Sequence, residues 1–233
     1  RIHSRFATEK RVESKRMGLL ENSVVIVTGG AGGIGRAYCK ALAQEGAAVV
    51  IADLVDAPDL VEEIEEHDGR AMSVITDVTD ISSTEQLASA TVQEFGRIDG
   101  LINNAAFYLA IEQGPFEELA PEEWDLCMAV NVKGTWLCSR AVAPVMKGQN
   151  RGSIINIASM VVNDGTPGFL HYVASKSAIW GLTRSMAREL GPFGVRVNTL
   201  TPDYIPHDKE YDEKQPGVND AITSRRCLNR TME

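Results

Sequence analysis

Apolar runs of strand length alternate with longer helical patterns along most of this chain, from residue 23 to about residue 200. The runs read SVVIVTG, AAVVIAD, AMSVITD, IDGLINN, GSIINIAS and GVRVNTL. The helical patterns between them cover residues 34–46, 57–68, 82–95, 121–147 and 171–191. Strands that are apolar throughout belong to parallel sheets covered on both faces, and right-handed crossovers place helices on both sides. The pattern therefore predicts an α/β fold with a doubly wound parallel sheet, whose ligands bind beyond the carboxyl ends of the strands.

The composition narrows the class of ligand. The chain has 233 residues, of which 44% are hydrophobic and 24% are charged, as expected for one globular domain with a buried core. A formal charge of −9 argues against nucleic acid and anionic membrane surfaces as partners, because both attract basic patches. No apolar run approaches the roughly 20 residues that span a bilayer. We therefore expect a single domain over residues 18–233 that acts on a small molecule.

The cysteines and histidines show no disulfide or metal pattern. The four cysteines are scattered without paired spacing, and the four histidines do not fall at zinc-ligand intervals. Neither a disulfide framework nor a metal site is expected, and a reducing cytoplasm fits the sequence.

Residues 1–17 form a basic leader that ends at Met17, where the hydrophobic pattern begins. The leader carries six lysines and arginines against two glutamates, and it lacks the apolar segment of a secretory signal. We interpret it as disordered or vector-derived sequence and exclude it from the fold. A basic, partly helical transit peptide is the alternative, which the two glutamates disfavour.

The first apolar run leads into a glycine-rich turn, TGGAGGIG, at residues 28–35. A pair of phosphates can lie against the start of a helix only where no side chain blocks the approach to the backbone. Gly29, Gly33 and Gly35 meet this requirement. Because tight turns also use glycine, the motif alone leaves a purely structural turn open.

Asp53 stands at the end of the second run, 18 residues beyond Gly35. From that position a carboxylate can accept hydrogen bonds from both hydroxyls of an adenosine ribose, and it repels a 2′-phosphate. Arg36 is the nearby positively charged residue that could bind such a phosphate. Leu54, which follows Asp53, carries no charge. With the glycine turn, Asp53 predicts a Rossmann-type dinucleotide site that prefers NAD to NADP. A solvated loop aspartate is the alternative.

The third and fourth runs end in polar clusters that would extend this site. Asp77 could accept a hydrogen bond from the adenine amino group while Val78 packs on the ring. Asn104, followed by the small Ala105 and Ala106, would let a cofactor pass close to the backbone. Read alone, either cluster is equally typical of a turn.

Together these motifs resemble the short-chain dehydrogenase/reductase family. Residues 20–205 carry TGGAGGIG, NNAA, NVKG, a serine at 159, YVASK and VRVN in the order and spacing of that family. The chain length and NNAA favour its short single-domain branch, and IADLVDAP is similar to NAD-dependent secondary-alcohol dehydrogenases. The resemblance implies an oxidoreductase acting on CH–OH groups, with the catalytic residues Asn131, Ser159, Tyr172 and Lys176. The motifs and the resemblance together give the expected cofactor-binding residues as Gly29, Gly33, Ile34, Gly35, Asp53, Asp77, Val78, Asn104, Ala105, Tyr172, Lys176, Pro202 and Ile205.

The spacing of Tyr172 and Lys176 has a chemical meaning beyond the resemblance. Residues four apart on a helix project from one face, so both side chains would enter the same site. A free phenol has a pKa of about 10, and a nearby ammonium lowers it by favouring the phenolate. Such a tyrosine could take the alcohol proton in oxidation or return it in reduction. Tyrosine and lysine also occur four apart on many helix surfaces, so the pair matters only in combination with the other motifs.

Ser159 and Asn131 complete the expected catalytic set. Ser159 would emerge at the same edge of the sheet, 13 residues before Tyr172, and could stabilise charge on the substrate oxygen. The resemblance implies that Asn131, expected at the start of a helix, holds a water linking the lysine to solvent.

The substrate is less constrained than the cofactor. Candidate wall residues are mostly apolar, which favours a medium-sized secondary alcohol or ketone. A 3-oxoacyl-type carbonyl reductase, or a nucleotide-binding module without turnover, remains an alternative. The acidic Asp164 and Asp203 are possible polar contacts but are expected at the surface. The candidate wall residues are Phe107, Tyr108, Leu109, Met160, Val161, Val162, Phe169, Tyr204 and Ile205.

The C-terminal part departs from the family pattern. The loop TPDYIPHD has Asp203 where relatives usually have glycine, and it lacks their following threonine. The chain stops before the last helix and strand of relatives, so the sheet is expected to lack that strand and to expose an edge. Helices 131–147 and 171–191 would still be available to form a homodimer or homotetramer.

Overall fold

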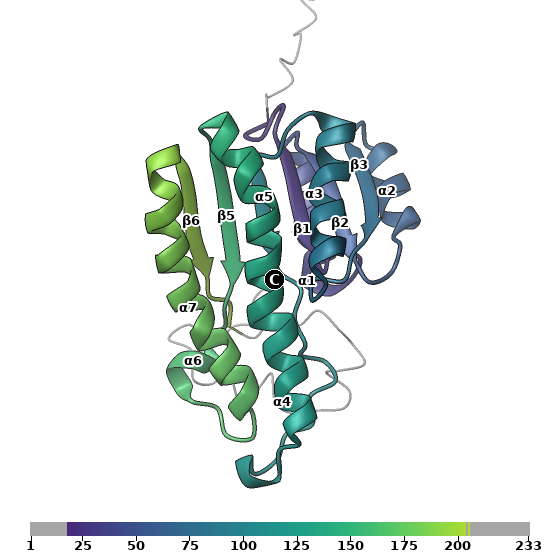
Figure 1. Cartoon of the computed structure of the whole chain (residues 1–233). Coiled ribbons are helices and arrows are strands. Elements are labelled where there is room, and N and C mark those ends of the chain that lie inside the picture. The colour runs from purple at the N-terminus through teal and green to yellow at the C-terminus, as the bar shows by residue number, and fades with distance from the viewer. Residues whose placement is uncertain (1–17, 204, 206–233) are drawn as a thin grey trace, which may run out of the picture.

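The computed structural model describes residues 18–203 and 205. These residues form a parallel sheet with the strand order β3-β2-β1-β4-β5-β6 (Figure 1). The predicted doubly wound sheet is therefore confirmed. The predicted leader and the predicted loss of a final strand both fall outside the described residues. The strands are β1 Val24–Thr28, β2 Ala48–Asp53, β3 Arg70–Ile75, β4 Gly100–Asn103, β5 Gly152–Ile157 and β6 Val195–Leu200.

Helices cover both faces of the sheet, and each face has its own hydrophobic core. Successive side chains of β1 point to opposite faces of the sheet, so Ile26 packs in one core and Val27 packs in the other. Helices α3, α5 and α7 pack on the first face, and α1 and α2 pack on the second (Figure 1). Their bounds are α1 Gly33–Gln44, α2 Pro58–Glu65, α3 Ile81–Phe95, α5 Thr135–Gln149 and α7 Leu170–Leu190.

Local sequence signals set the ends of these helices. Pro58 begins α2 at a position where a missing N–H costs nothing. Asp80 caps α3 by accepting a hydrogen bond of 2.7 Å from the backbone N–H of Ser82. Gly96 ends α3 in the left-handed conformation, with φ of 74°. The predicted helix bounds are therefore correct to within a few residues.

The segment 121–147, predicted to be helical with a helix beginning at Asn131, consists of three parts. Helix α4 spans Pro121–Met128, a π-helical segment η2 spans Ala129–Gly134, and α5 follows. The expectation that Asn131 begins a helix is wrong, because a proline at the first position starts the helical segment ten residues earlier. Asn131 instead lies inside the π-helical turn, a local widening that is frequent at functional sites.

The sheet reverses its strand order between β1 and β4. The chain runs outward from β1 through β2 to β3 and then returns to the other side of β1. Crossovers diverge at this point, so the carboxyl ends of the two central strands open into a crevice. The motif residues of the sequence gather there.

Candidate active site

A cavity of about 1050 Å³ opens at the carboxyl ends of the strands. Its lining includes every predicted cofactor-binding residue, and it includes three of the four predicted catalytic residues, Ser159, Tyr172 and Lys176. Asn131 is the exception and lies behind the cavity wall. The cofactor-binding predictions that line the cavity are Gly29, Gly33, Ile34, Gly35, Asp53, Asp77, Val78, Asn104, Ala105, Tyr172, Lys176, Pro202 and Ile205.

The glycine turn between β1 and α1 is closely packed around its own backbone. Gly29 and Gly33 have φ of 63° and 51°, values that favour glycine. A Cβ atom on Gly35 would lie 1.9 Å from the carbonyl oxygen of Gly29. The amide of Asn104 donates hydrogen bonds to the carbonyl oxygens of Thr28 and Gly29, at 3.0 and 3.1 Å. The turn is thus held from β4, and its backbone remains accessible from the cavity.

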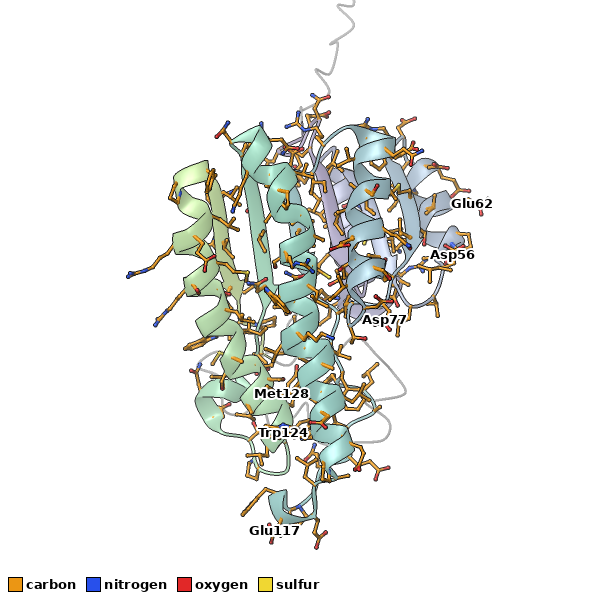
Figure 2. The ribbon with its side chains drawn as sticks, viewed as in Figure 1. Asp56, Glu62, Asp77, Glu117, Trp124 and Met128 are labelled. Atoms are coloured by element: carbon orange, nitrogen blue, oxygen red, sulfur yellow. The ribbon has the colours of Figure 1, made fainter. Side chains whose placement is uncertain are left out.

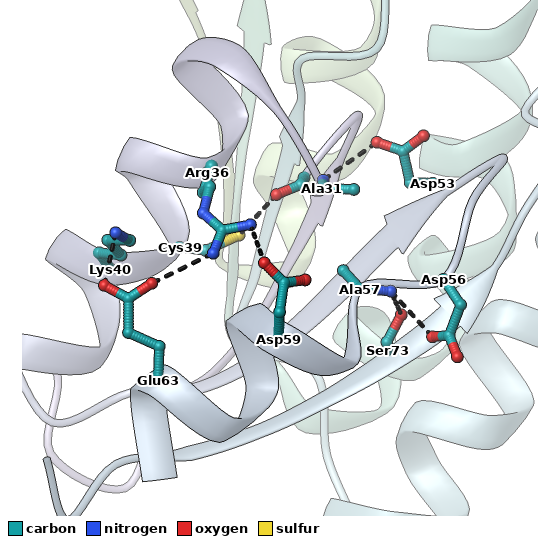
Figure 3. A network of polar contacts seen from close by, with 11 residues as sticks. Ala31, Arg36, Cys39, Lys40, Asp53, Asp56, Ala57, Asp59, Glu63 and Ser73 are labelled. Atoms are coloured by element: carbon teal, nitrogen blue, oxygen red, sulfur yellow. Dashed lines mark hydrogen bonds and ion pairs between the residues drawn. The ribbon is translucent and has the colours of Figure 1, made fainter. Parts of the chain in front are cut away.

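Asp53 connects the end of β2 to the glycine turn. Its carboxylate accepts a hydrogen bond of 3.0 Å from the backbone N–H of Ala31 (Figure 3). It also accepts one of 2.7 Å from the backbone N–H of Leu54. Asp53 also lines the cavity. A carboxylate is therefore present where the sequence predicts the ribose hydroxyls to bind.

Asp77 and Val78 lie beyond the end of β3. Figure 2 shows Asp77 near the lower end of the sheet. The Asp77 carboxylate accepts hydrogen bonds from the N–H and the hydroxyl of Thr79, at 2.8 and 2.7 Å. Val78 packs against Gly134, where an added Cβ would lie 2.8 Å from a valine methyl group. The two residues thus shape the cavity edge as a rigid turn.

Tyr172 and Lys176 lie side by side on α7, as their spacing predicts. The Lys176 Nζ atom is 5.6 Å from the centre of the Tyr172 ring. The ring also packs against Tyr108 and Phe169, with centroids 5.1 and 6.0 Å away. Tyr172 is 8% exposed, so its orientation is restricted by contacts on several sides.

Lys176 is a buried ammonium with a backbone partner. Its Nζ donates a hydrogen bond of 2.8 Å to the carbonyl oxygen of Ile157, the last residue of β5. Burial removes the ammonium from water and lowers the pKa of Lys176 to about 8. The sequence could place this lysine on the helix, but it could not show that β5 supplies the acceptor.

Asn131 is almost fully buried between η2 and α7. Its Oδ1 accepts a hydrogen bond of 2.7 Å from the N–H of Phe107, and its Nδ2 donates to Ser175 at 3.0 Å. Ser175 in turn donates to the carbonyl oxygen of Tyr172 at 2.8 Å. Two successive hydrogen bonds therefore link Asn131 to Ser175, and Ser175 to the backbone of Tyr172. Sequence reasoning missed Ser175, although it stands inside YVASK.

The predicted cavity wall is correct in part. Of the candidates, Phe107 and Val162 do not line the cavity, and Tyr204 lies outside the described residues. Asp164 and Asp203 both line the cavity; Asp164 is exposed, as expected, whereas Asp203 is half-buried. Asp164 ends a short helix after β5, α6 Val161–Asp164, and Asp203 lies in the loop after β6. Lining residues that the sequence did not suggest include Thr76, Gln113, Val130 and Thr166.

Three further features concern metal ligands, membrane spans and thiols. Among residues 18–203 and 205, no group of three or more histidine, cysteine or acidic side chains is arranged to hold a metal ion. In the same part of the chain, the helices are too short or too polar to cross a membrane. The cysteines that the structure describes, Cys39, Cys127 and Cys138, are buried free thiols.

The burial of Lys176 predicts a pH-dependent gain in stability on replacing it. Below about pH 8 both the folded and unfolded chains carry the charge, and the fold bears the full desolvation cost. As the pH rises from about 8 to 10.5, the folded chain loses its proton first and the cost disappears. We expect Lys176→Met to raise the free energy of unfolding at pH 7 by about 1–3 kcal/mol, reduced by the lost hydrogen bond. Urea unfolding at pH 7 and pH 10.5 measures this, and the gain should vanish at the higher pH.

Lys133→Met is the matched control for this experiment, because Lys133 is an exposed lysine on η2. We expect its effect on stability to be the same at both pH values. If Lys176→Met lowers stability equally at pH 7 and pH 10.5, burial of the ammonium is not the source of the pKa shift.

The chain matches the family model described as short chain dehydrogenase over residues 23–215. It is 36% identical over 199 residues to 3-oxoacyl-[acyl-carrier-protein] reductase FabG of Thermotoga maritima, covering 84% of this chain and 80% of that protein. It is 36% identical over 191 residues to cyclopentanol dehydrogenase of a Comamonas species, covering 81% and 75%.

The fold is also shared with solved structures. The crystal structure of NAD⁺-bound xylitol dehydrogenase superposes with a TM-score of 0.83 at 28% identity, covering 91% of this chain and 88% of that chain. On these matches, the chain belongs to the short-chain dehydrogenase/reductase family, and it is an oxidoreductase acting on CH–OH or carbonyl groups with a nicotinamide cofactor.

Proposed function

We propose that this enzyme uses NAD to interconvert a medium-sized secondary alcohol and its ketone, with Tyr172 as the general acid and base. The observation that carries the proposal is the placement of the Lys176 ammonium 5.6 Å from the Tyr172 ring on the wall of the cavity. An ammonium in that position favours the phenolate over the phenol. Ser159 lines the same cavity and is the residue we assign to the substrate oxygen.

The proton and the hydride take separate routes in this proposal. In oxidation, the alcohol proton moves to the Tyr172 oxygen while Ser159 stabilises the charge that develops on the substrate oxygen. A bound nicotinamide would supply the hydride acceptor in oxidation and the hydride donor in reduction. Asn131 and Ser175 hold the helical turn that bears Tyr172. We also assign to Asn131 a water that would return the proton from Lys176 to solvent.

The residues around the glycine turn fit a dinucleotide. A Cβ on Gly29 would lie 2.9 Å from the Cα of Ala105. The backbone after β1 therefore packs closely against the backbone after β4, with no room for a side chain between them. The N-terminus of α1 directs free backbone N–H groups to this place, which suits a pyrophosphate. Asp53 would accept from the ribose hydroxyls and would repel a 2′-phosphate, which supports NAD over NADP.

The charge of the cavity supports an uncharged substrate. Among the lining residues that the structure describes, Lys176 is the only cation, and four are aspartates. An anionic substrate would find no free counter-charge on these residues. The apolar part of the wall suits a hydrocarbon ring or chain beside the reacting carbon, and consists of Tyr108, Leu109, Met160, Val161, Phe169 and Ile205.

Two features bear on assembly and location. Trp136 on α5 and Trp180 on α7 are 46% and 36% exposed, which supports our proposal that these helices form the interface of a homodimer or homotetramer. The free thiols of the described cysteines suit a reducing compartment, and we propose the cytoplasm.

A reductase acting on a 3-oxoacyl thioester is the second candidate. The likeness to the Thermotoga reductase supports it, because that match covers slightly more of this chain than the cyclopentanol dehydrogenase match does. The lack of a free cation among the described lining residues counts against it, since acyl carriers bring a phosphate group with them.

A cofactor and substrate panel tests the proposal. The enzyme is incubated with NAD⁺ or NADP⁺ and cyclic, aromatic and linear secondary alcohols at mildly alkaline pH, and the absorbance of the reduced nicotinamide is followed. We expect turnover with NAD⁺, and kcat/KM with NADP⁺ lower by at least about tenfold, a difference of about 1.4 kcal/mol. Turnover of a 3-oxoacyl thioester with NADPH, and none of alcohols, would favour the second candidate. Binding of NADH without any turnover would instead indicate a nucleotide-binding module.

A further inference from the structure

Arg36 stands directly beside the glycine turn but does not reach into the cavity. Its backbone N–H donates to the carbonyl oxygen of Gly32 at 3.1 Å, so it lies about 6 Å further along α1. The residues from Gly32 to Gly35 line the cavity, whereas Arg36 does not. Asp53 contacts Ala31 of the same turn, so Arg36 and the expected place of a 2′-phosphate adjoin one glycine turn.

Two carboxylates on α2 hold the Arg36 side chain. Its Nη1 is 2.7 Å from Asp59, and its Nη2 is 3.1 Å from Glu63. Figure 3 shows the guanidinium directed at Asp59, while Asp53 points at Ala31. Asp59 and Glu63 are four residues apart and therefore project from one face of α2 toward α1.

Positively charged side chains of α1 pair with both carboxylates of α2. Glu63 also pairs with Lys40, which lies one helical turn after Arg36 on α1. The hydrogen bond from Arg36 lowers the pKa of Asp59, and the hydrogen bond from Lys40 lowers the pKa of Glu63. Both acids are therefore charged at neutral pH, and the donors of the arginine fork are directed to them rather than to the cavity.

An arginine fork is well suited to a phosphate, because two parallel N–H groups can bind two of its oxygens. We propose that Asp59 and Glu63 are specificity-determining residues, which strengthen the preference for NAD by holding Arg36 away from the place of a 2′-phosphate. They would act through Arg36 and not by touching the cofactor. The inference rests on the proposed use of NAD and adds a second device to the repulsion by Asp53.

The full test removes both carboxylates. Exposed ion pairs are weak one by one, and either acid alone would still hold the arginine in part. We expect the double variant Asp59→Asn/Glu63→Gln to bind NADPH about tenfold more tightly than the wild type. Its Kd for NADH should stay within about twofold, since the ribose contact of Asp53 is untouched. Titrations followed by nicotinamide fluorescence at low ionic strength give both constants.

The same helix offers a matched control. Glu62 and Glu66 are exposed acids of α2 and its C-terminal cap, and they have the same spacing of four residues. Figure 2 shows Glu62 at the outer edge of the molecule. The double variant Glu62→Gln/Glu66→Gln removes the same charge without touching Arg36, so its Kd for NADPH should change by less than about twofold. Adding Arg36→Gln to the first double variant should abolish the gain.

The outcomes separate the two proposals. A wild type that binds NADPH as tightly as NADH overturns the proposed cofactor, and this inference with it. If the wild type prefers NADH but Asp59→Asn/Glu63→Gln binds NADPH no more tightly than the wild type, this inference alone is overturned. An equal gain in the Glu62/Glu66 variant, or a gain that survives loss of Arg36, also overturns it, because the cause would then be net charge. Circular dichroism checks that each variant is folded, and Asp59→Asn alone, with a smaller gain expected, serves if the double variant is not.

Discussion

Replacing Tyr172 by phenylalanine is expected to lower kcat about 10³-fold while leaving the affinity for NADH nearly unchanged. The proposed proton exchange needs the phenolic oxygen, and positioned acid–base groups contribute about 10²–10⁴-fold. The ring itself packs between Tyr108 and Phe169, and phenylalanine preserves those contacts. Initial rates with the best alcohol of the panel, together with a titration by NADH, measure the two quantities on the same preparation.

Tyr38→Phe is the control for this substitution. Tyr38 lies on α1, half-buried against the second core, and takes no part in the cavity lining. Removal of its hydroxyl should change kcat by less than about twofold. Full turnover in Tyr172→Phe would refute the proposed mechanism, and loss of NADH binding in that variant would mean that the tyrosine serves the cofactor instead.

The second large effect is expected for Gly35→Ala, which should lower the free energy of unfolding by at least about 2 kcal/mol or prevent folding. The new Cβ would lie 1.9 Å from the carbonyl oxygen of Gly29 and 2.8 Å from the amide nitrogen of Asn104. Both atoms belong to the hydrogen bond that holds the turn, so neither can move without cost. Urea unfolding curves of the purified variants measure the change in midpoint and slope.

The neighbouring Gly32→Ala provides the contrast. A Cβ at Gly32 meets no atom within 4 Å, and its φ of −140° is open to any residue. We expect a change in stability within about 1 kcal/mol, the usual scale for a substitution at a helix N-cap. If both alanine variants were equally stable, the turn would be looser than its contacts imply.

Much of this molecule is encoded in short-range patterns. The apolar runs became strands because a segment apolar on both faces can be buried only in the interior of a covered sheet. The carboxyl ends of parallel strands share one edge, so Asp53, Asp77 and Asn104 could be assigned to one site before any coordinates were considered. The helix period of 3.6 residues likewise brought Tyr172 and Lys176 together.

Some residues could not be assigned in this way. Gln113 and Thr166 reach the cavity from loops, which carry no periodic signal. Asp203 was expected at the surface because an acidic side chain in a loop is usually solvated, yet it lines the cavity. Asn131 was assigned to the start of a helix, because no periodic signal marks the π-helical turn that follows the segment begun at Pro121.

The sequence by itself determined which segments form the sheet, at which edge the motif residues gather, and that a phenol and an ammonium share a helical face. Those properties follow from the spacing of residues along the chain, which fixes direction within one element. Only the tertiary structure decided that Lys176 is stripped of water beside the Ile157 carbonyl, and that Arg36 is held by the acids of α2. These depend on which elements pack together, because desolvation and ion pairing are set by neighbours distant in the chain.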